Sequence, residues 1–201
     1  MRWAARRCRN FTNYLPDAIS VIYTFSTSVV APGDFSTLSQ AWPRLQIVGL
    51  DMSDAYVRHA RRHLGRWSRT RFVVGKAEAI PFPDSSQDAV TSIFLFHELP
   101  PKVRRSALRE CARVLKPGGR LIIQDSLQRD DQKDYKGLLQ LFPQKYHEPY
   151  YASYTTEDFG ALASDYDLVH VRSAMAFVSK IMVFDKLQRR HETTPARASG
   201  R

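Results

Sequence analysis

The sequence has few cysteines, no long apolar run and no acidic residue near its start. Its two cysteines, Cys8 and Cys111, form no recognisable metal or redox motif, which excludes a disulfide framework and favours a reducing compartment. No apolar run approaches the roughly 20 residues that span a bilayer, so no transmembrane helix is predicted. We expect an intracellular, soluble protein, in the cytoplasm or in an organelle such as a plastid or mitochondrion.

The formal net charge of +10 lies mainly at the two ends of the chain. Residues 1–16 hold four arginines and no acid, a pattern that resembles an organellar transit peptide but equally suits a disordered end. The other 185 residues divide into one domain over residues 17–187 and a disordered basic tail over residues 188–201. Because the body is only mildly basic, we expect no nucleic-acid partner and no membrane surface.

Residues 88–124 predict one strand, one helix and a second strand in a single unit. Residues 89–96 and 121–123 are apolar and β-prone, as in strands buried on both faces. Between these two runs, apolar residues recur at three- and four-residue steps, as on one side of a helix. The opposite side of that helix has several arginines, including Arg104, and the acid Glu110. The run Pro117-Gly118-Gly119 is expected to end the helix. This pattern predicts a βαβ crossover in a parallel sheet.

The remaining chain extends this unit on both sides. Further strands are predicted over residues 18–30, 46–50, 71–74, 167–174 and 176–186, and helices over residues 35–42, 53–65, 135–141 and 155–163. Residues 143–154 are predicted to form an aromatic loop, and the last two strands an antiparallel hairpin. The order indicates an α/β fold.

In an open parallel sheet, ligands bind beyond the carboxyl ends of the strands. Asp51 follows a predicted strand and can accept hydrogen bonds from two ribose hydroxyls, although an acid there can also simply cap the next helix. The loop 75–82 and the run Phe96-His97-Glu98 follow two further strands. These positions predict a nucleotide-like cofactor site.

Three runs in register carry a family resemblance: IVGLDMS, VVGKAEAIPFPDSSQDAV and LRECARVLKPGGRLIIQDS. They resemble motifs of the class I S-adenosylmethionine-dependent methyltransferases over about residues 44–126. The resemblance implies a Rossmann-like fold with a mostly parallel seven-stranded sheet and a C-terminal antiparallel hairpin. It also implies S-adenosylmethionine as cofactor and methyl transfer to a small-molecule acceptor.

The same resemblance implies roles for single residues. Asp51 would bind the ribose hydroxyls and Met52 the adenine, Ala77 and Glu78 would lie along the adenine edge, and Phe94 and Phe96 under the methionine portion. Lys76 departs from the family pattern, because it cannot accept a bond from the adenine amino group.

The first glycine motif of the family is degenerate. The run TFSTSVVAPGDFST stands where the family has DxGxGxG, and Gly33 is its only glycine. Either Gly33 and the following amides form an unusual loop that holds the cofactor, or the chain before about Pro32 is altered. We favour the second interpretation, which leaves a catalytically impaired methyltransferase-like binding domain as the alternative function.

His97 is the candidate general base, since an imidazole titrates near neutral pH; the alternative is a structural histidine held by its neighbour Glu98 or by a backbone group. A substrate lid is predicted from His147, Glu148, Tyr150 and Tyr151, which could instead cover the sheet edge.

A nicotinamide-dependent oxidoreductase is disfavoured, because no GxGxxG follows the first strand. No metal site is predicted, because His59 and His63 have no third ligand nearby.

Overall fold

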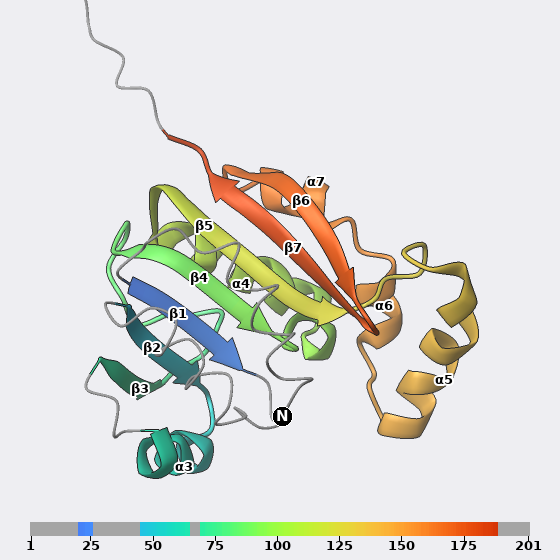
Figure 1. Cartoon of the computed structure of the whole chain (residues 1–201), viewed down its shortest axis with the longest axis horizontal. Helices are drawn as coiled ribbons and strands as arrows, with labels where there is room; N and C mark the ends of the chain where they lie inside the picture. Colours follow the sequence, from blue (N-terminus) through green and yellow to red (C-terminus); the bar gives the residue numbers. More distant parts are fainter. Residues whose placement is uncertain (1–19, 26–44, 65–68, 189–201) are drawn as a thin grey trace, which may run out of the picture.

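Figure 1 shows the fold of the chain in a computed structural model, which describes residues 20–25, 45–64 and 69–188. Two predictions lie outside these residues: the helix over residues 35–42 and the loop around Gly33. The two predicted terminal segments lie almost wholly outside them as well. The first strand is described by its backbone alone.

The strands of the described residues form one mixed sheet in the order β3-β2-β1-β4-β5-β7-β6. The first five in this order are parallel, whereas β7 runs antiparallel to both β5 and β6. The strands are β1 (Ser20–Phe25), β2 (Gln46–Asp51), β3 (Thr70–Val74), β4 (Gln87–Ile93), β5 (Leu115–Ser126), β6 (Leu168–Ala176) and β7 (Ser179–Lys186). This is a Rossmann-like α/β fold, and the predicted closing hairpin is present.

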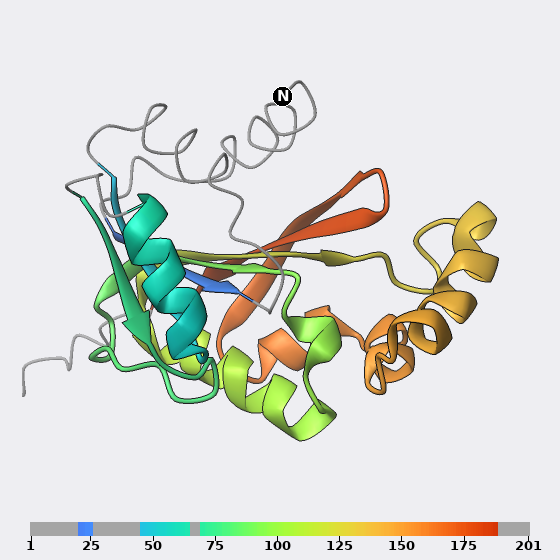
Figure 2. The ribbon, with the colours of Figure 1, turned by 90° about the horizontal axis from the view of Figure 1, so that it is seen from below.

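The helices lie on the faces of the sheet and beyond one of its ends. The described helices are α3 (Asp54–Leu64), α4 (Pro101–Val114), α5 (Lys136–Tyr146), α6 (Tyr151–Thr155) and α7 (Phe159–Ser164), with 3₁₀ turns η1 (Phe96–Glu98) and η2 (Lys133–Tyr135). Figure 2 shows α4 and α7 on the same side of the sheet. In both views α5 and α6 lie past the carboxyl end of β5.

The core lies between α4 and the central strands. Ala107, Leu108, Cys111 and Val114 of α4 are buried, which confirms the apolar stripe predicted for this helix. They pack in one cluster with Val90 and the alternating apolar residues of β5. Burial of a leucine or valine such as Leu108 or Val114 contributes about 1.5–3 kcal/mol, so α4 is packed firmly against the sheet.

Two local predictions were wrong. Residues 143–154 are largely helical and not a loop, because Pro143 is accommodated inside α5, and Tyr151 begins α6 with its ring buried. The predicted stop at Pro117 is misplaced as well: α4 ends at Val114 and β5 begins at once. The Pro117–Gly119 run lies instead where the register between β4 and β5 shifts.

Candidate active site

The carboxyl ends of β2, β3 and β4 bring the predicted cofactor residues to one edge of the sheet. Asp51 is the last residue of β2, and its carbonyl oxygen accepts a hydrogen bond from the Gly75 amide after β3, at 2.9 Å. The chain then turns back through a bridge between Lys76 and Ala79. Strand order reverses between β1 and β4, so this edge is the usual binding crevice of a doubly wound sheet.

Asp51 has one carboxylate oxygen committed to the fold. Its Oδ1 accepts a hydrogen bond from the Ser53 amide at 2.7 Å, as in a turn that leads into α3. Partial burial raises the pKa of Asp51, the Ser53 bond opposes this change, and the charge of Glu98 adds to it. The influence of Glu98 shows that the ends of β2 and β4 share one electrostatic environment.

His97 is buried and held by an acid that follows it by 28 residues. Its Nδ1 lies 2.6 Å from Oδ1 of Asp125, near the end of β5. The Asp125 carboxylate also accepts bonds from the amides of Phe96 and Ser126, at 2.8 and 2.7 Å. Three contacts therefore fix this carboxylate and orient the imidazole, so that its Nε2 is the ring nitrogen left for a ligand.

The pKa of His97 is raised by the acids around it. Burial alone lowers this pKa, but the hydrogen bond and charge of Asp125, with the charges of Glu98 and Glu148, outweigh that effect. Burial raises the pKa of Glu148, and the charge of His97 opposes the change. These carboxylates therefore stabilise the protonated imidazole, so a proton taken up by the neutral ring would be held more firmly than in a free histidine.

A cavity of about 460 Å³ lies against His97 at the carboxyl ends of β4 and β5. Its wall is mostly apolar and aromatic and comes from the end of β4, from α5 and α6 and from the β6–β7 turn. The lining residues include Phe94, Leu139, Phe142, Tyr146, Tyr151 and Val178, with Glu98 and Glu148 as the acids. The ring of Tyr151 meets that of His97 edge-on, with centroids 5.9 Å apart. A cavity of this kind suits a small, mainly aromatic molecule.

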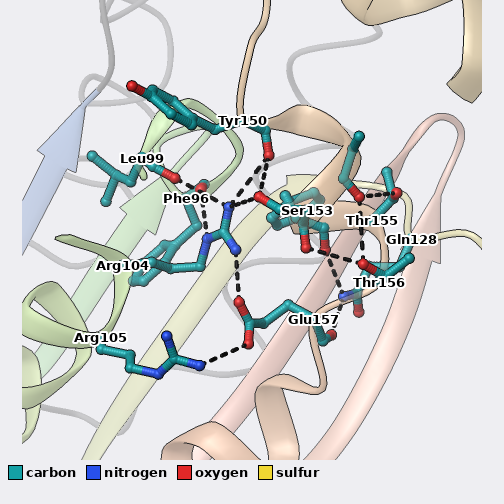
Figure 3. A network of polar contacts seen from close by, with 12 residues as sticks. Phe96, Leu99, Arg104, Arg105, Gln128, Tyr150, Ser153, Thr155, Thr156 and Glu157 are labelled. Carbon is teal, nitrogen blue, oxygen red and sulfur yellow. Dashed lines mark hydrogen bonds and ion pairs between the residues drawn. The ribbon is translucent and has the colours of Figure 1, made fainter. Parts of the chain in front are cut away.

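A buried arginine ties this cavity to the rest of the fold, as Figure 3 shows. Arg104 is fully buried, and its Nη1 donates to Glu157 at 2.7 Å. Its other nitrogens donate to the carbonyls of Phe96 and Leu99, at 3.2 and 3.1 Å, and to Oγ of Ser153, at 3.2 Å. The turn that carries His97 and the helix that carries Tyr151 are thus held by one guanidinium group.

The structure brings together some of the residues that the sequence predicted and separates others. Phe94, His97, Glu148 and Tyr151 all line the cavity. The Phe96 ring lies in the core and not in the cavity wall, at 5.6 Å from the ring of Phe159.

Other predicted residues lie at the surface around the site. Met52 is 73% exposed, and Ala77 and Glu78 are half-buried in the turn after Gly75. His147 is exposed and ends α5 in a left-handed conformation, with φ at 57°. Tyr150 is 38% exposed and contributes its carbonyl oxygen to the Arg104 network. The roles proposed for these residues remain predictions.

The sequence analysis missed Asp125 and the wall residues of α5. Asp125 comes two residues after the apolar run 121–123 and is the last residue but one of β5, so a signal similar to that of Asp51 was available for it. Phe142 and Tyr146 lie one helical turn apart, with ring centroids 4.7 Å apart, but the predicted loop hid this spacing.

No helix in the described part of the chain is long and apolar enough to cross a membrane.

Comparisons with known proteins agree with this arrangement. Residues 30–123 match the family model described as "Methyltransferase domain". The chain is 37% identical over 124 residues to the demethylmenaquinone methyltransferase of Thermotoga maritima, covering 62% of this chain and 52% of that protein. It is 41% identical over 90 residues to a ubiquinone/menaquinone biosynthesis C-methyltransferase of Methylobacterium nodulans, covering 44% of this chain and 35% of that protein.

The fold has the same likeness among solved structures. A SAM-dependent methyltransferase from Aquifex aeolicus superposes with a TM-score of 0.64 at 15% identity, over 92% of this chain and 89% of that one. This likeness concerns the fold alone. The chain spans about half the length, or less, of the two curated relatives named above.

Proposed function

We propose that the chain is a class I S-adenosylmethionine-dependent methyltransferase and that it transfers a methyl group from S-adenosylmethionine to a small hydroxylated aromatic acceptor. The observation that carries the proposal is the aromatic cavity beside a buried histidine that an aspartate holds at 2.6 Å. Both lie next to the edge where Asp51 would hold the cofactor. The two quinone-pathway relatives support an acceptor with such a ring.

The described residues of the cofactor edge fit this ligand. Asp51 keeps its second carboxylate oxygen for the ribose hydroxyls, since only Oδ1 takes the Ser53 amide. Ala77 and Glu78 stand in the turn beside it, where the adenine edge would lie. When bound, S-adenosylmethionine supplies an electrophilic methyl group on a sulfonium.

His97 acts as the base in this proposal. Its Nε2 takes the hydroxyl proton of the acceptor, and the phenolate that remains has more electron density on its ring carbons. One of these carbons would form the bond to the methyl group as the methyl–sulfur bond breaks and S-adenosylhomocysteine leaves, and the proton of that carbon would then pass to the phenolate oxygen. Asp125 keeps the Nδ1 proton in place and stabilises the resulting imidazolium. The aromatic rings of Phe142 and Tyr151 hold the acceptor plane and exclude water, which is the main task in an in-line displacement.

The first experiment is calorimetric titration of the full chain with S-adenosylmethionine and S-adenosylhomocysteine. Asp51→Ala removes the acceptor of two hydroxyl bonds, so we expect binding to weaken about a hundredfold, at ~1.5 kcal/mol for each charged bond. Asp54→Asn, three residues on and exposed in its pair with Arg58, is the matched control and should bind as the parent does.

A transfer assay with hydroxylated naphthalenes then tests the base. His97→Ala should leave cofactor binding unchanged and reduce turnover, by about a hundredfold for the loss of a general base. Equal loss of cofactor binding in His97→Ala and Asp51→Ala would contradict these roles. If a folded chain bound neither ligand at millimolar concentration, the altered glycine motif would make it a methyltransferase-like binding domain.

A further inference from the structure

One group of side chains in the cavity has the composition of a metal site. His97, Glu98 and Glu148 each offer one ligand atom, and these atoms lie within 4.8 Å of one another. Glu148 follows α5, whereas the other two residues belong to η1, so only the fold brings the three together. Two ligand atoms of one tetrahedral cation lie about 3.5 Å apart, because metal–ligand bonds are about 2.0–2.2 Å long, so these side chains would have to draw together by up to about 1.5 Å, a change that rotation of the two glutamate side chains can supply.

The histidine gives a second and independent indication. His97 is only 7% exposed and lines the cavity. Its Nδ1 is held by Asp125 at 2.6 Å, and its Nε2 has no hydrogen-bond partner among the described residues. A carboxylate behind one imidazole nitrogen, with the other nitrogen facing an open cavity, is the arrangement that orients metal-binding histidines.

The charges around the histidine also favour a cation. Three carboxyl groups, those of Asp125, Glu98 and Glu148, act on one imidazole. Carboxylates placed in this way would attract a divalent cation. One nitrogen and two carboxylate oxygens leave at least one coordination position open toward the cavity, as in sites that also bind a ligand.

We propose that His97, Glu98 and Glu148 bind one divalent first-row transition cation, with Asp125 as the positioning residue. The site lies in the cavity of the proposed methyl transfer, but its existence does not depend on that reaction. A bound cation takes the same Nε2 that the proposed reaction uses as base, so we expect Zn²⁺ to inhibit transfer by the active enzyme.

The test is titration of the full chain with Co²⁺, followed by visible absorption, which reports nitrogen and oxygen ligands directly. A second histidine pair must first be removed, because His59 and His63 lie one turn apart on α3 with ring centroids 4.2 Å apart and could chelate Co²⁺ themselves. The titration therefore uses the variant His59→Gln/His63→Gln as its parent. We expect one equivalent of Co²⁺ to bind to it.

Two additional substitutions and one control show whether the bound Co²⁺ ion lies at the proposed site. Glu148→Gln should weaken Co²⁺ binding at least tenfold, and the fold should tolerate it, because the Glu148 carboxylate accepts no hydrogen bond from the described residues. Asp125→Asn should weaken binding by about 10–100-fold through the orientation of His97. His147→Asn, next to Glu148 but exposed, should bind Co²⁺ as the parent does.

Absence of a bound equivalent in the parent would overturn the proposal, as would binding that survives Glu148→Gln or is lost in His147→Asn. The titration contains no S-adenosylmethionine, so its result is independent of methyl transfer. Co²⁺ binding without transfer would therefore contradict the proposed function alone, and transfer without Co²⁺ binding would contradict the metal site alone.

Discussion

Glu157→Gln is expected to destabilise the protein by about 3 kcal/mol, because it leaves the charge of Arg104 buried without its counterion. The Arg104 side chain has no exposed surface, and that of Glu157 is 17% exposed. Removing one partner of such a pair costs about 3–5 kcal/mol. The lower end applies here, because three neutral oxygens still accept from the guanidinium within 3.2 Å.

Urea unfolding, followed by circular dichroism, measures this loss. For a chain of this length, about 3 kcal/mol corresponds to a fall in Tm of roughly 6–12 °C. The matched control is Asp185→Asn, which breaks a pair with Arg120 whose side chains are 28% and 38% exposed. Its expected cost is about 1 kcal/mol, because both side chains keep contact with solvent.

The combined variant Arg104→Met/Glu157→Leu separates charge from packing. If the cost of Glu157→Gln comes from an uncompensated buried charge, replacing both partners by apolar residues should recover a large part of it. The reasoning is refuted if Glu157→Gln costs no more than Asp185→Asn. It is also refuted if the double variant is less stable than Glu157→Gln.

Two further predictions concern the last turns of α4 and the first part of β5. The pKa of Glu110 is lowered, chiefly by its bond to Arg113, so this carboxylate stabilises the fold at neutral pH and the contribution is lost as the pH falls. Glu110→Gln should therefore cost about 1 kcal/mol at pH 7 and progressively less below the ordinary pKa of 4.5, in urea unfolding across pH. A pH-independent difference would contradict this. Gly119→Ala places a Cβ 2.8 Å from the carbonyl oxygen of Lys116 and should cost about 2 kcal/mol in the same assay. Gly137→Ala, with open space around its Cβ, is the control and should cost nothing.

The elements that the sequence predicted well are those with a strong local signal. The strand ending at Asp51 and the helix after Ser53 have an uninterrupted apolar run and an N-terminal cap, and both formed with bounds within a residue or two. Residues 143–154 had no such signal. A proline and a run of tyrosines locally resemble a loop, and only packing of Phe142 against Tyr151, with ring centroids 4.8 Å apart, makes this segment helical.

Arg104 shows a different limit of the periodicity argument. The helical pattern assigned it to the polar side of α4, yet it is fully buried. The polar side of a helix is solvated only where no other segment covers it. Here α6 and Glu157, which lie some 50 residues later in the chain, pack over Arg104. A pair between Arg104 and an acid as distant in the chain as Glu157 produces no periodic pattern in the sequence. The Arg104 network could therefore not be predicted from local patterns.

The position of Asp125 in the site could have been predicted from the order of the strands in the sheet. An acid at the carboxyl end of a buried parallel strand lies at the edge where ligands bind, and this holds for Asp125 near the end of β5 as it does for Asp51 at the end of β2. The sequence-based alternative for His97 paired it with its neighbour Glu98, whereas the structure pairs it with Asp125 at 2.6 Å. Since β4 and β5 are adjacent and parallel, residues that follow their carboxyl ends must meet, whatever their separation in the chain. Strand order, rather than distance along the sequence, therefore decides which acid orients a histidine at this edge.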